Sequence, residues 1–311
     1  MPSIVVIGSI NMDLVCRTPR IPKPGETVMG KHDLVTVPGG KGANQAVAAA
    51  RLGGNVHLVA RVGEDEFGNR LITGLQENGV SCTHVHRTAN TSSGCATILV
   101  DDHGENSIVV APGANAKLTP EDIDAAENLI RDASIVLVQL EVPFKTVKHV
   151  LTIARRHEVF TMLDPAPAPV DLPKALYHVD IMTPNQTEAE KLLGQAVRRR
   201  RKAIDAKADA ADLIARGPRN VILKLSAAGC LIVTSAGEIT RVKSFKTKVV
   251  DTTAAGDAFA GAFAVAYTEG KSLADAARFA NAAGAIACTT FGAQPSLPRR
   301  EAVDRLLLRS R

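Results

Sequence analysis

Aromatic residues are scarce in this chain of 311 residues, which has no tryptophan, two tyrosines and an aromatic content of 3%. A planar ligand would therefore be held by aliphatic side chains and backbone groups rather than by stacked rings. The five cysteines are scattered and odd in number, and none of them forms a CxxC pair. This pattern argues against a disulfide framework and against a zinc site, and it is typical of the reducing cytoplasm.

Long apolar runs are also missing, since no stretch approaches the roughly 18 residues that would cross a bilayer. The chain begins Met1-Pro2-Ser3 and enters an apolar stretch at once, without the basic region of a signal peptide. We therefore expect a cytoplasmic protein that neither spans a membrane nor is secreted.

The formal net charge of +5 comes mainly from residues 198–202 and from the arginine-rich last residues, while the signs are mixed elsewhere. No aromatic residue interleaves with the basic run. Such a run is more typical of a solvated face than of a nucleic-acid surface, so we expect no nucleic-acid partner.

Short β-branched runs alternate with segments of helical character along most of the chain. The runs lie at residues 4–7, 56–60, 135–139, 159–163, 180–182 and 221–225. This alternation predicts βαβ units and a mostly parallel sheet covered by helices. Gly53 and Gly79 stand where helix C-caps belong, and Thr119-Pro120 is typical of a helix start. The alanine-rich residues 203–216 predict a further helix.

Two regions interrupt this alternation, at approximately residues 11–37 and 92–110. The second predicts a hairpin in which residues 94–100 and 106–110 flank a turn at 101–105. Strands that leave the main sheet early in the chain indicate a small lid, which would close over a substrate and exclude water. An irregular excursion of the main sheet is the alternative.

The strongest local signal is the stretch 249–259, which passes from a strand through small residues into an apolar helix. The backbone N–H groups of Ala254, Ala255 and Gly256 can approach a phosphoryl oxygen closely, and the helix dipole adds partial positive charge. Asp257 follows in the first helical turn, where it could accept a proton from an attacking hydroxyl. The alternative is that Asp257 merely caps the helix.

A second glycine-rich turn, residues 38–45, also runs into an alanine-rich helix. Its glycines, Gly39 and Gly40 among them, let the backbone approach a ligand, and Lys41 and Asn44 could present donors to a polyol. The turn is not a Walker A loop, because no serine or threonine follows the lysine. A simple tight connection is the alternative.

Further polar residues fall just past the ends of predicted strands, where open α/β sheets bind ligands. Their shared position indicates one cleft, although a loop hydrogen bond would explain any one of them alone. These residues are Asn11, Asp13, Glu141, Asp164, Asn185, Glu188 and Lys224.

Together the two glycine motifs resemble the signatures of the ribokinase-like carbohydrate kinases, the PfkB family, and the similarity extends over nearly the whole chain. The matching stretches are residues 8–13, 24–27, 39–46, 183–190, 251–257 and 292–296. The resemblance implies a three-layer α/β/α sandwich over residues 1–311 with a small β-sheet lid. It also implies transfer of the γ-phosphoryl group of ATP to the 5-hydroxyl of D-ribose, with Mg²⁺ carried by ATP, potassium or a similar cation as activator, and a homodimer formed through the lid.

Residue roles follow from the same resemblance. It implies that Asp257 is the catalytic base and Ala254, Ala255 and Gly256 the anion hole. The positions that match ribose binding are Asn11, Asp13, Gly39, Gly40, Lys41, Asn44, Glu141 and Asp257. Those that match nucleotide binding are Asn185, Lys224, Ser226, Gly229, Gly256 and Asn281. Asn185 and Glu188 match an element linked indirectly to magnesium. The monovalent-cation loop corresponds to Asp251, Thr253, Ala287, Thr290, Gly292 and Ser296.

Two departures from the family stand out. Ser226 replaces a usual glycine, so its side chain could crowd the nucleotide phosphates, and the basic run 198–202 replaces a usually more acidic segment. The alternatives to a ribose kinase are a kinase of the same family for another sugar or a nucleoside, and a non-catalytic sugar-binding regulator. The stretch 254–257 argues against the regulator, because a protein without catalysis has no need of a base beside an anion hole.

Overall fold

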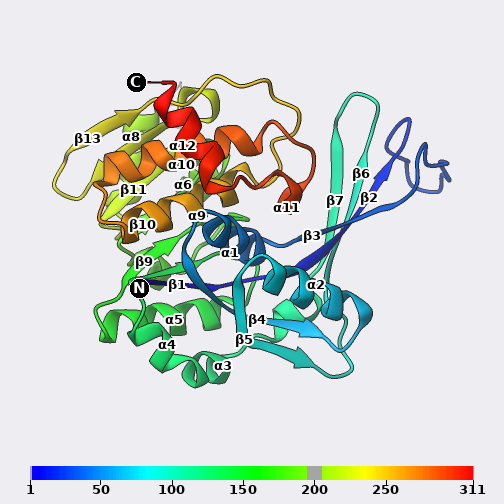
Figure 1. Ribbon diagram of the computed structural model, residues 1–311, viewed down its shortest axis with the longest axis horizontal. Helices are drawn as coiled ribbons and strands as arrows, with labels where there is room; N and C mark the ends of the chain where they lie inside the picture. Colours follow the sequence, from blue (N-terminus) through cyan, green and yellow to red (C-terminus); the bar gives the residue numbers. More distant parts are fainter. Residues whose placement is uncertain (1, 195–204, 311) are drawn as a thin grey trace.

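The computed structural model describes residues 2–194 and 205–310, and its largest element is a sheet of nine strands in the order β13-β12-β11-β10-β9-β8-β1-β4-β5 (Figure 1). The strands from β11 to β5 are parallel, whereas β12 and β13 are antiparallel at one edge. The strands are β1 (Ser3–Ile7), β4 (Asn55–Gly63), β5 (Val80–Thr88), β8 (Ile135–Val138), β9 (Phe160–Leu163), β10 (Ile181–Met182), β11 (Asn220–Lys224), β12 (Cys230–Thr234) and β13 (Ile239–Val242). The predicted strands are all present.

Helices cover both faces of this sheet. In β1, Ile4 and Val6 face one apolar cluster while Val5 and Ile7 face the other, which is why the strand is apolar throughout. One layer holds α1 (Lys41–Arg51), α2 (Glu66–Glu77), α9 (Ala255–Thr268), α10 (Leu273–Ala287) and α12 (Arg300–Leu308). The other holds α3 (Pro120–Ala125), α4 (Glu127–Arg131), α5 (Phe144–Arg156), α6 (Gln186–Leu193) and α8 (Ala206–Ile214). The predicted α/β/α sandwich is therefore confirmed.

A second sheet of four strands, in the order β3-β2-β6-β7, projects from one side of the molecule (Figure 1). It consists of β2 (Asn11–Arg17), β3 (Val35–Gly39), β6 (Gly94–Val100) and β7 (Asn106–Ala111). The predicted hairpin is present, because β6 and β7 pair antiparallel from Val100 and Asn106 onward. The first strand pair ends at Gly39, slightly beyond the expected limit at residue 37. The sheet occupies the region expected for a lid, and its closure over a substrate stays a prediction.

The helix ends carry the expected signals. Thr119 and Asp122 form a capping box at the start of α3, with Pro120 in the first turn. Gly53 and Gly79 follow α1 and α2 with φ of +93° and +80°, the left-handed backbone that favours glycine. The predicted helix at 203–216 is α8, although its first two positions lie outside the described residues, as does the basic run 198–202.

Shorter helical turns complete the connections, and none of the helices described here is long and apolar enough to cross a membrane. These turns are η1 (Gly113–Lys117), η2 (Lys174–Tyr177), η3 (Ser226–Ala228) and α11 (Ala293–Ser296).

Candidate active site

The candidate site lies at the carboxyl edge of the parallel strands, where β8, β9 and β11 end at or just before Glu141, Asp164 and Lys224. The N-termini of α1 and α9 meet there, because the two helices pack closely. A Cβ atom on Gly261 would lie 2.7 Å from the Gln45 carbonyl oxygen, so only glycine permits this approach. The two glycine-rich motifs, far apart in the chain, thereby form one site.

Asp257 is the buried centre of this site, with 5% of its surface exposed. Its Oδ2 accepts a hydrogen bond of 2.9 Å from Asn44 Nδ2, and its Oδ1 accepts one of 3.2 Å from Gln45 Nε2. Burial raises the pKa of Asp257 to about 6, against the lowering effect of the Lys41 charge. Both hydrogen bonds come from α1, and Ala254, the N-cap of α9, makes no side-chain cap. Asp257 is thus held by side chains across the site.

The turn before α9 is built of small residues with an unusual backbone. Ala254 has φ of +58°, in the left-handed region that non-glycine residues rarely adopt. The Ala255 N–H makes a long hydrogen bond of 3.3 Å to the Thr252 carbonyl, and α9 begins with a bond of 2.8 Å from Ala258 N to Ala254 O. The first N–H groups of a helix have no partner within it, so this turn can receive an anion.

Asp13 lies on β2 with 9% of its surface exposed. Its carboxylate packs against Gly39 on β3 so closely that a Cβ there would lie 2.2 Å from Oδ2. Burial raises the pKa of Asp13 to about 7, and the negative charges of Glu141 and Asp257 add to the rise. The next residue, Gly40, has φ of +87° and turns the chain into α1.

Lys41, Glu141 and Asn11 line the same region. Glu141 Oε2 accepts hydrogen bonds from the Ser9 hydroxyl and, at 3.1 Å, from the Lys41 N–H. Burial lowers the pKa of Lys41, but the negative charges of Asp257, Asp164 and Glu141 outweigh it and raise the pKa overall. Asn11 Oδ1 accepts a bond of 2.7 Å from Asn115 Nδ2.

Asn185 and Glu188 form the start of α6. Asn185 Oδ1 accepts a hydrogen bond of 2.8 Å from the Glu188 N–H, and Glu188 Oε2 accepts one of 2.7 Å from the Asn185 N–H. Burial raises the pKa of Glu188, although the Lys224 charge opposes the rise. This capping box fixes a half-buried carboxylate at the edge of the site.

Of the predicted nucleotide residues beyond Lys224, Ser226 begins η3, Gly229 directly precedes β12, and Asn281 lies in α10. Ser226 has φ of +52°, so the position where the family usually carries glycine has the backbone that favours glycine. At Gly229, a Cβ would lie 2.0 Å from the Val242 carbonyl oxygen. Asn281 Nδ2 donates bonds of 3.3 Å to Val242 O and 3.2 Å to Lys243 O, which tie α10 to the segment after β13.

Three residues of the expected cation loop, Asp251, Thr253 and Gly292, are in contact. Asp251 Oδ2 accepts a hydrogen bond of 2.9 Å from the Gly292 N–H, and Oδ1 accepts bonds from the Thr253 N–H at 2.9 Å and its hydroxyl at 2.7 Å. Burial would raise the pKa of Asp251, but these hydrogen bonds lower it below its ordinary value. Ala287 is buried, Thr290 is exposed, and the Ser296 hydroxyl donates to Ala293 O.

Sequence reasoning missed three amides that organise the site. Gln45 follows Asn44 within the glycine motif, Gln139 directly follows the apolar strand β8, and Asn115 lies in η1 after the hairpin. Gln139 Nε2 donates a bond of 2.6 Å to Gln45 Oε1. A polar residue at the end of an apolar run was the available signal for Gln139, whereas Asn115 gave none.

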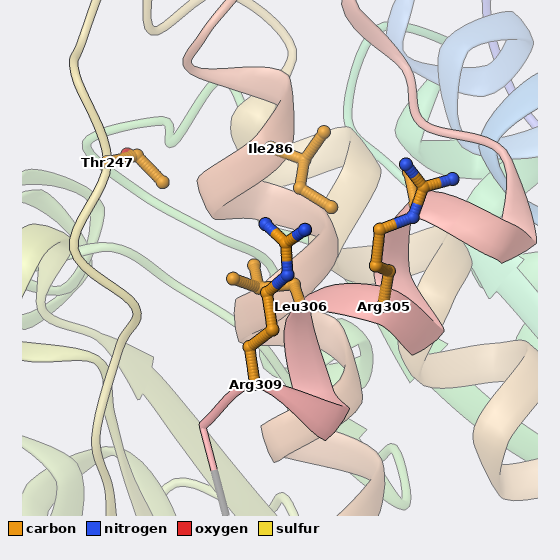
Figure 2. Close-up of a pocket in the computed structure, with 6 residues that line it drawn as sticks. Thr247, Ile286, Arg305, Leu306 and Arg309 are labelled. Atoms are coloured by element: carbon orange, nitrogen blue, oxygen red, sulfur yellow. The ribbon is translucent and has the colours of Figure 1, made fainter.

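A separate hollow of about 200 Å³ lies between α10, α12 and the segment before α9 (Figure 2). It is lined by Thr247, Ile286, Ala302, Arg305, Leu306 and Arg309. None of these belongs to the predicted site, so this hollow is distinct from the candidate site at the strand ends.

Comparison with known proteins identifies the family. The pfkB family carbohydrate kinase model matches residues 1–300. The chain belongs to this family. It is 39% identical to a ribokinase of Bacillus subtilis over 307 residues, which is 99% of this chain and all of the relative. It is also 37% identical to a deoxyribokinase of Salmonella typhi over 306 residues, 98% of each chain.

Solved structures agree with the fold. A ribokinase of Thermotoga maritima superposes with a TM-score of 0.88 at 38% identity, covering 99% of this chain and 100% of that one. A ribokinase of Arabidopsis thaliana, solved with ribose and ATP, gives a TM-score of 0.88 at 34% identity, covering 98% of both chains.

Proposed function

We propose that this protein transfers the γ-phosphoryl group of ATP to the 5-hydroxyl of D-ribose, giving D-ribose 5-phosphate and ADP. The observation that carries the proposal is Asp257, a buried carboxylate beside the open turn at the start of α9 and held by Asn44 and Gln45. Because its pKa is raised only to about 6, Asp257 is mostly ionised at neutral pH and can accept a proton. The ribokinase relatives support the choice of sugar.

The sugar would bind between the second sheet and α1. Asn44 Oδ1 is buried without a hydrogen-bond partner among the described residues, so a sugar hydroxyl would satisfy it. Asp13 and Glu141 supply carboxylate acceptors nearby, while Lys41 supplies a donor. Gly39 and Gly40 would border the ring with backbone atoms alone, and Asn11 completes the proposed set.

ATP would lie along the carboxyl ends of β10 and β11, with its γ-phosphoryl group at the turn Ala254, Ala255 and Gly256. The N–H groups of this turn and the dipole of α9 would stabilise negative charge there. The proposed nucleotide contacts are Asn185, Lys224, Ser226, Gly229, Gly256 and Asn281.

Magnesium would arrive with ATP and neutralise phosphate charge. Mg²⁺ keeps several water ligands and commonly uses one or two carboxylates together with phosphates. The fixed, half-buried carboxylate of Glu188, paired with Asn185, fits such an indirect role.

Potassium or a similar cation would bind in the loop formed by Asp251, Thr253, Ala287, Thr290, Gly292 and Ser296. The loop supplies oxygen donors, which hard cations prefer, and Asp251 is a charged one. Asp251 also accepts hydrogen bonds from Gly292 and Thr253, and these bonds connect the two segments of the loop.

The assembly we propose is a homodimer formed through the second sheet, in the cytoplasm. The strand β7 is exposed along its whole length, and its apolar residues Ile108, Val109 and Val110 are 51%, 70% and 48% exposed. A second copy would cover them. All five cysteines are free, which suits a reducing compartment.

The deoxyribokinase relative favours 2-deoxyribose as a second candidate substrate. The decisive assay measures ADP formation with ribose, 2-deoxyribose, other sugars and adenosine. We expect the largest kcat/KM with ribose. A larger value with another acceptor would replace ribose within the family, and no ADP formation with any acceptor would favour a sugar-binding regulator.

A further inference from the structure

A buried ion pair joins two strands at the floor of the candidate site. Lys224 ends β11 and Asp164 directly follows β9, and Lys224 Nζ lies 3.0 Å from Asp164 Oδ1. Their side chains are only 14% and 3% exposed. Removing two charges from water costs about as much as their attraction returns, so an apolar pair would serve stability equally well. The charges therefore call for a functional reason.

The ammonium of Lys224 borders the anion-binding turn. A Cβ atom built on Gly256 would have Lys224 Nζ as its nearest neighbour, at 3.4 Å. An ammonium group carries three donors, and Asp164 is its only hydrogen-bond partner among the described residues. The Lys224 ammonium therefore has N–H groups left to donate to a ligand that binds beside Gly256.

Hydrogen bonds link the same ion pair to the carboxylate of Asp257. Asp164 Oδ2 accepts a hydrogen bond of 3.1 Å from Gln45 Nε2, which also donates at 3.2 Å to Asp257 Oδ1. Gln139 donates to Gln45 Oε1 at 2.6 Å and so fixes the direction of the amide. The negative charge of Asp164 contributes to the raised pKa of Asp257.

We propose that Lys224 is a further catalytic residue, whose ammonium contacts the transferred phosphoryl group, and that Asp164 and Gln45 are positioning residues that align it with Asp257. This rests on the proposed kinase function. In the step, the sugar 5-oxygen forms a bond to the γ-phosphorus, the bond from that phosphorus to the β-phosphate oxygen breaks, and ADP leaves with the electron pair. The hydroxyl proton goes to Asp257. Lys224 keeps its protons and stabilises charge on the phosphoryl oxygens.

Lys224→Met tests the contact, because it keeps most of the length of the side chain and removes the charge. We expect kcat to fall by about 10²–10³-fold, as for loss of one oxyanion-hole donor. The KM for sugar should stay within about threefold, and the KM for ATP should rise by a smaller factor than kcat falls, because the contact to the γ-phosphoryl group strengthens in the transition state. ADP with aluminium fluoride, a mimic of the transferring group, should bind more weakly by a similar factor, while ADP alone should not. A raised KM for ATP with an unchanged kcat would overturn the proposal.

Two variants separate this role from folding. Arg61→Met breaks the partly buried pair of Arg61 and Asp122 outside the site, and it should lower the Tm without lowering kcat. If Lys224→Met alone fails to fold, the double variant Asp164→Asn with Lys224→Met removes both charges and keeps the test. A double variant that folds and retains native kcat would also overturn the proposal.

Asp164→Asn tests the positioning role through the pH profile. Because the Asp164 charge raises the pKa of Asp257, its removal should move the acid limb of kcat to lower pH, besides lowering kcat. An unmoved limb would leave Asp164 as a structural partner only. All variants are measured with the acceptor that the wild type uses best, so that a wrong sugar and a wrong role for Lys224 give different results.

Discussion

Two aspartates on either side of the start of α9 are held in opposite ways. Asp251 accepts hydrogen bonds from backbone and hydroxyl donors, which lower its pKa despite burial. Asp257 is more deeply buried, is held by side-chain amides and lies near the Asp164 charge, and its pKa is raised to about 6. One carboxylate is therefore a permanent charge, and the other is able to change its protonation state near neutral pH.

The opposite pKa shifts of Asp251 and Asp257 also give opposite pH dependences of folding stability. The folded protein disfavours the Asp257 carboxylate, so ionising it costs stability as pH rises above its pKa in the unfolded chain. The folded protein favours the Asp251 carboxylate, whose contribution is present above about pH 3.8 and is lost as pH falls through its lowered pKa.

The largest expected effect is that of Asp257→Asn, which removes the titrating member of the pair. Turnover should fall by at least about 10²-fold, because the amide keeps the shape but cannot take the proton. Ribose binding, measured by calorimetry, should persist. If Asp257→Asn kept near-native turnover, Asp257 would have only a structural role.

Asp13→Ala removes a third buried carboxylate, which should bind the sugar rather than accept the proton of its hydroxyl. We expect the KM for ribose to rise roughly 10- to 100-fold, since hydroxyls left unpaired in a dry pocket cost about 1–3 kcal/mol. The KM for ATP should change little. Asp33→Ala, at an exposed site on the same segment, is the control, and calorimetry showing native ribose affinity for Asp13→Ala would exclude Asp13 from the site.

Asp251 should act through a bound cation, so potassium should raise kcat more than sodium does at constant ionic strength. The gain should be smaller than the effect of about 10²-fold expected at Asp257, because the cation would align the turn 254–256 and would touch no reacting atom. Asp251→Ala and Asp251→Asn should both abolish the activation. If Asp251→Asn is still activated, Asp251 only ties the loop to Gly292 and Thr253.

The smallest effect should come from Ser226→Gly, outside the pair of aspartates. The left-handed backbone at Ser226 costs a side chain about 1 kcal/mol, which glycine would recover in part. The free energy of unfolding should therefore rise slightly, and the KM for ATP should not increase. If urea unfolding showed Ser226→Gly to be less stable than the wild type, the left-handed backbone at Ser226 would not be strained.

Local patterns were enough to predict much of this molecule. The β-branched runs gave the parallel strands, Thr119 and Pro120 gave a helix start, and the two glycine motifs gave the residues that meet in the site. The pattern could not show that Gln45 bridges Asp164 and Asp257, because that contact depends on the packing of α1 against α9 at Gly261. Nor could it give the pKa difference between Asp251 and Asp257, which arises from burial and from partners distant in the sequence.

The pH dependence of kcat, at saturating ATP and ribose, tests the central claim most directly when wild type and Asp257→Asn are measured side by side. The wild-type rate should fall with unit slope on the acid side of the profile, where Asp257 in the enzyme–substrate complex becomes protonated. Asp257→Asn should be slow at every pH and should lack this limb. If the variant kept the limb and a near-native rate, another group would be the base and the account of Asp257 would be wrong.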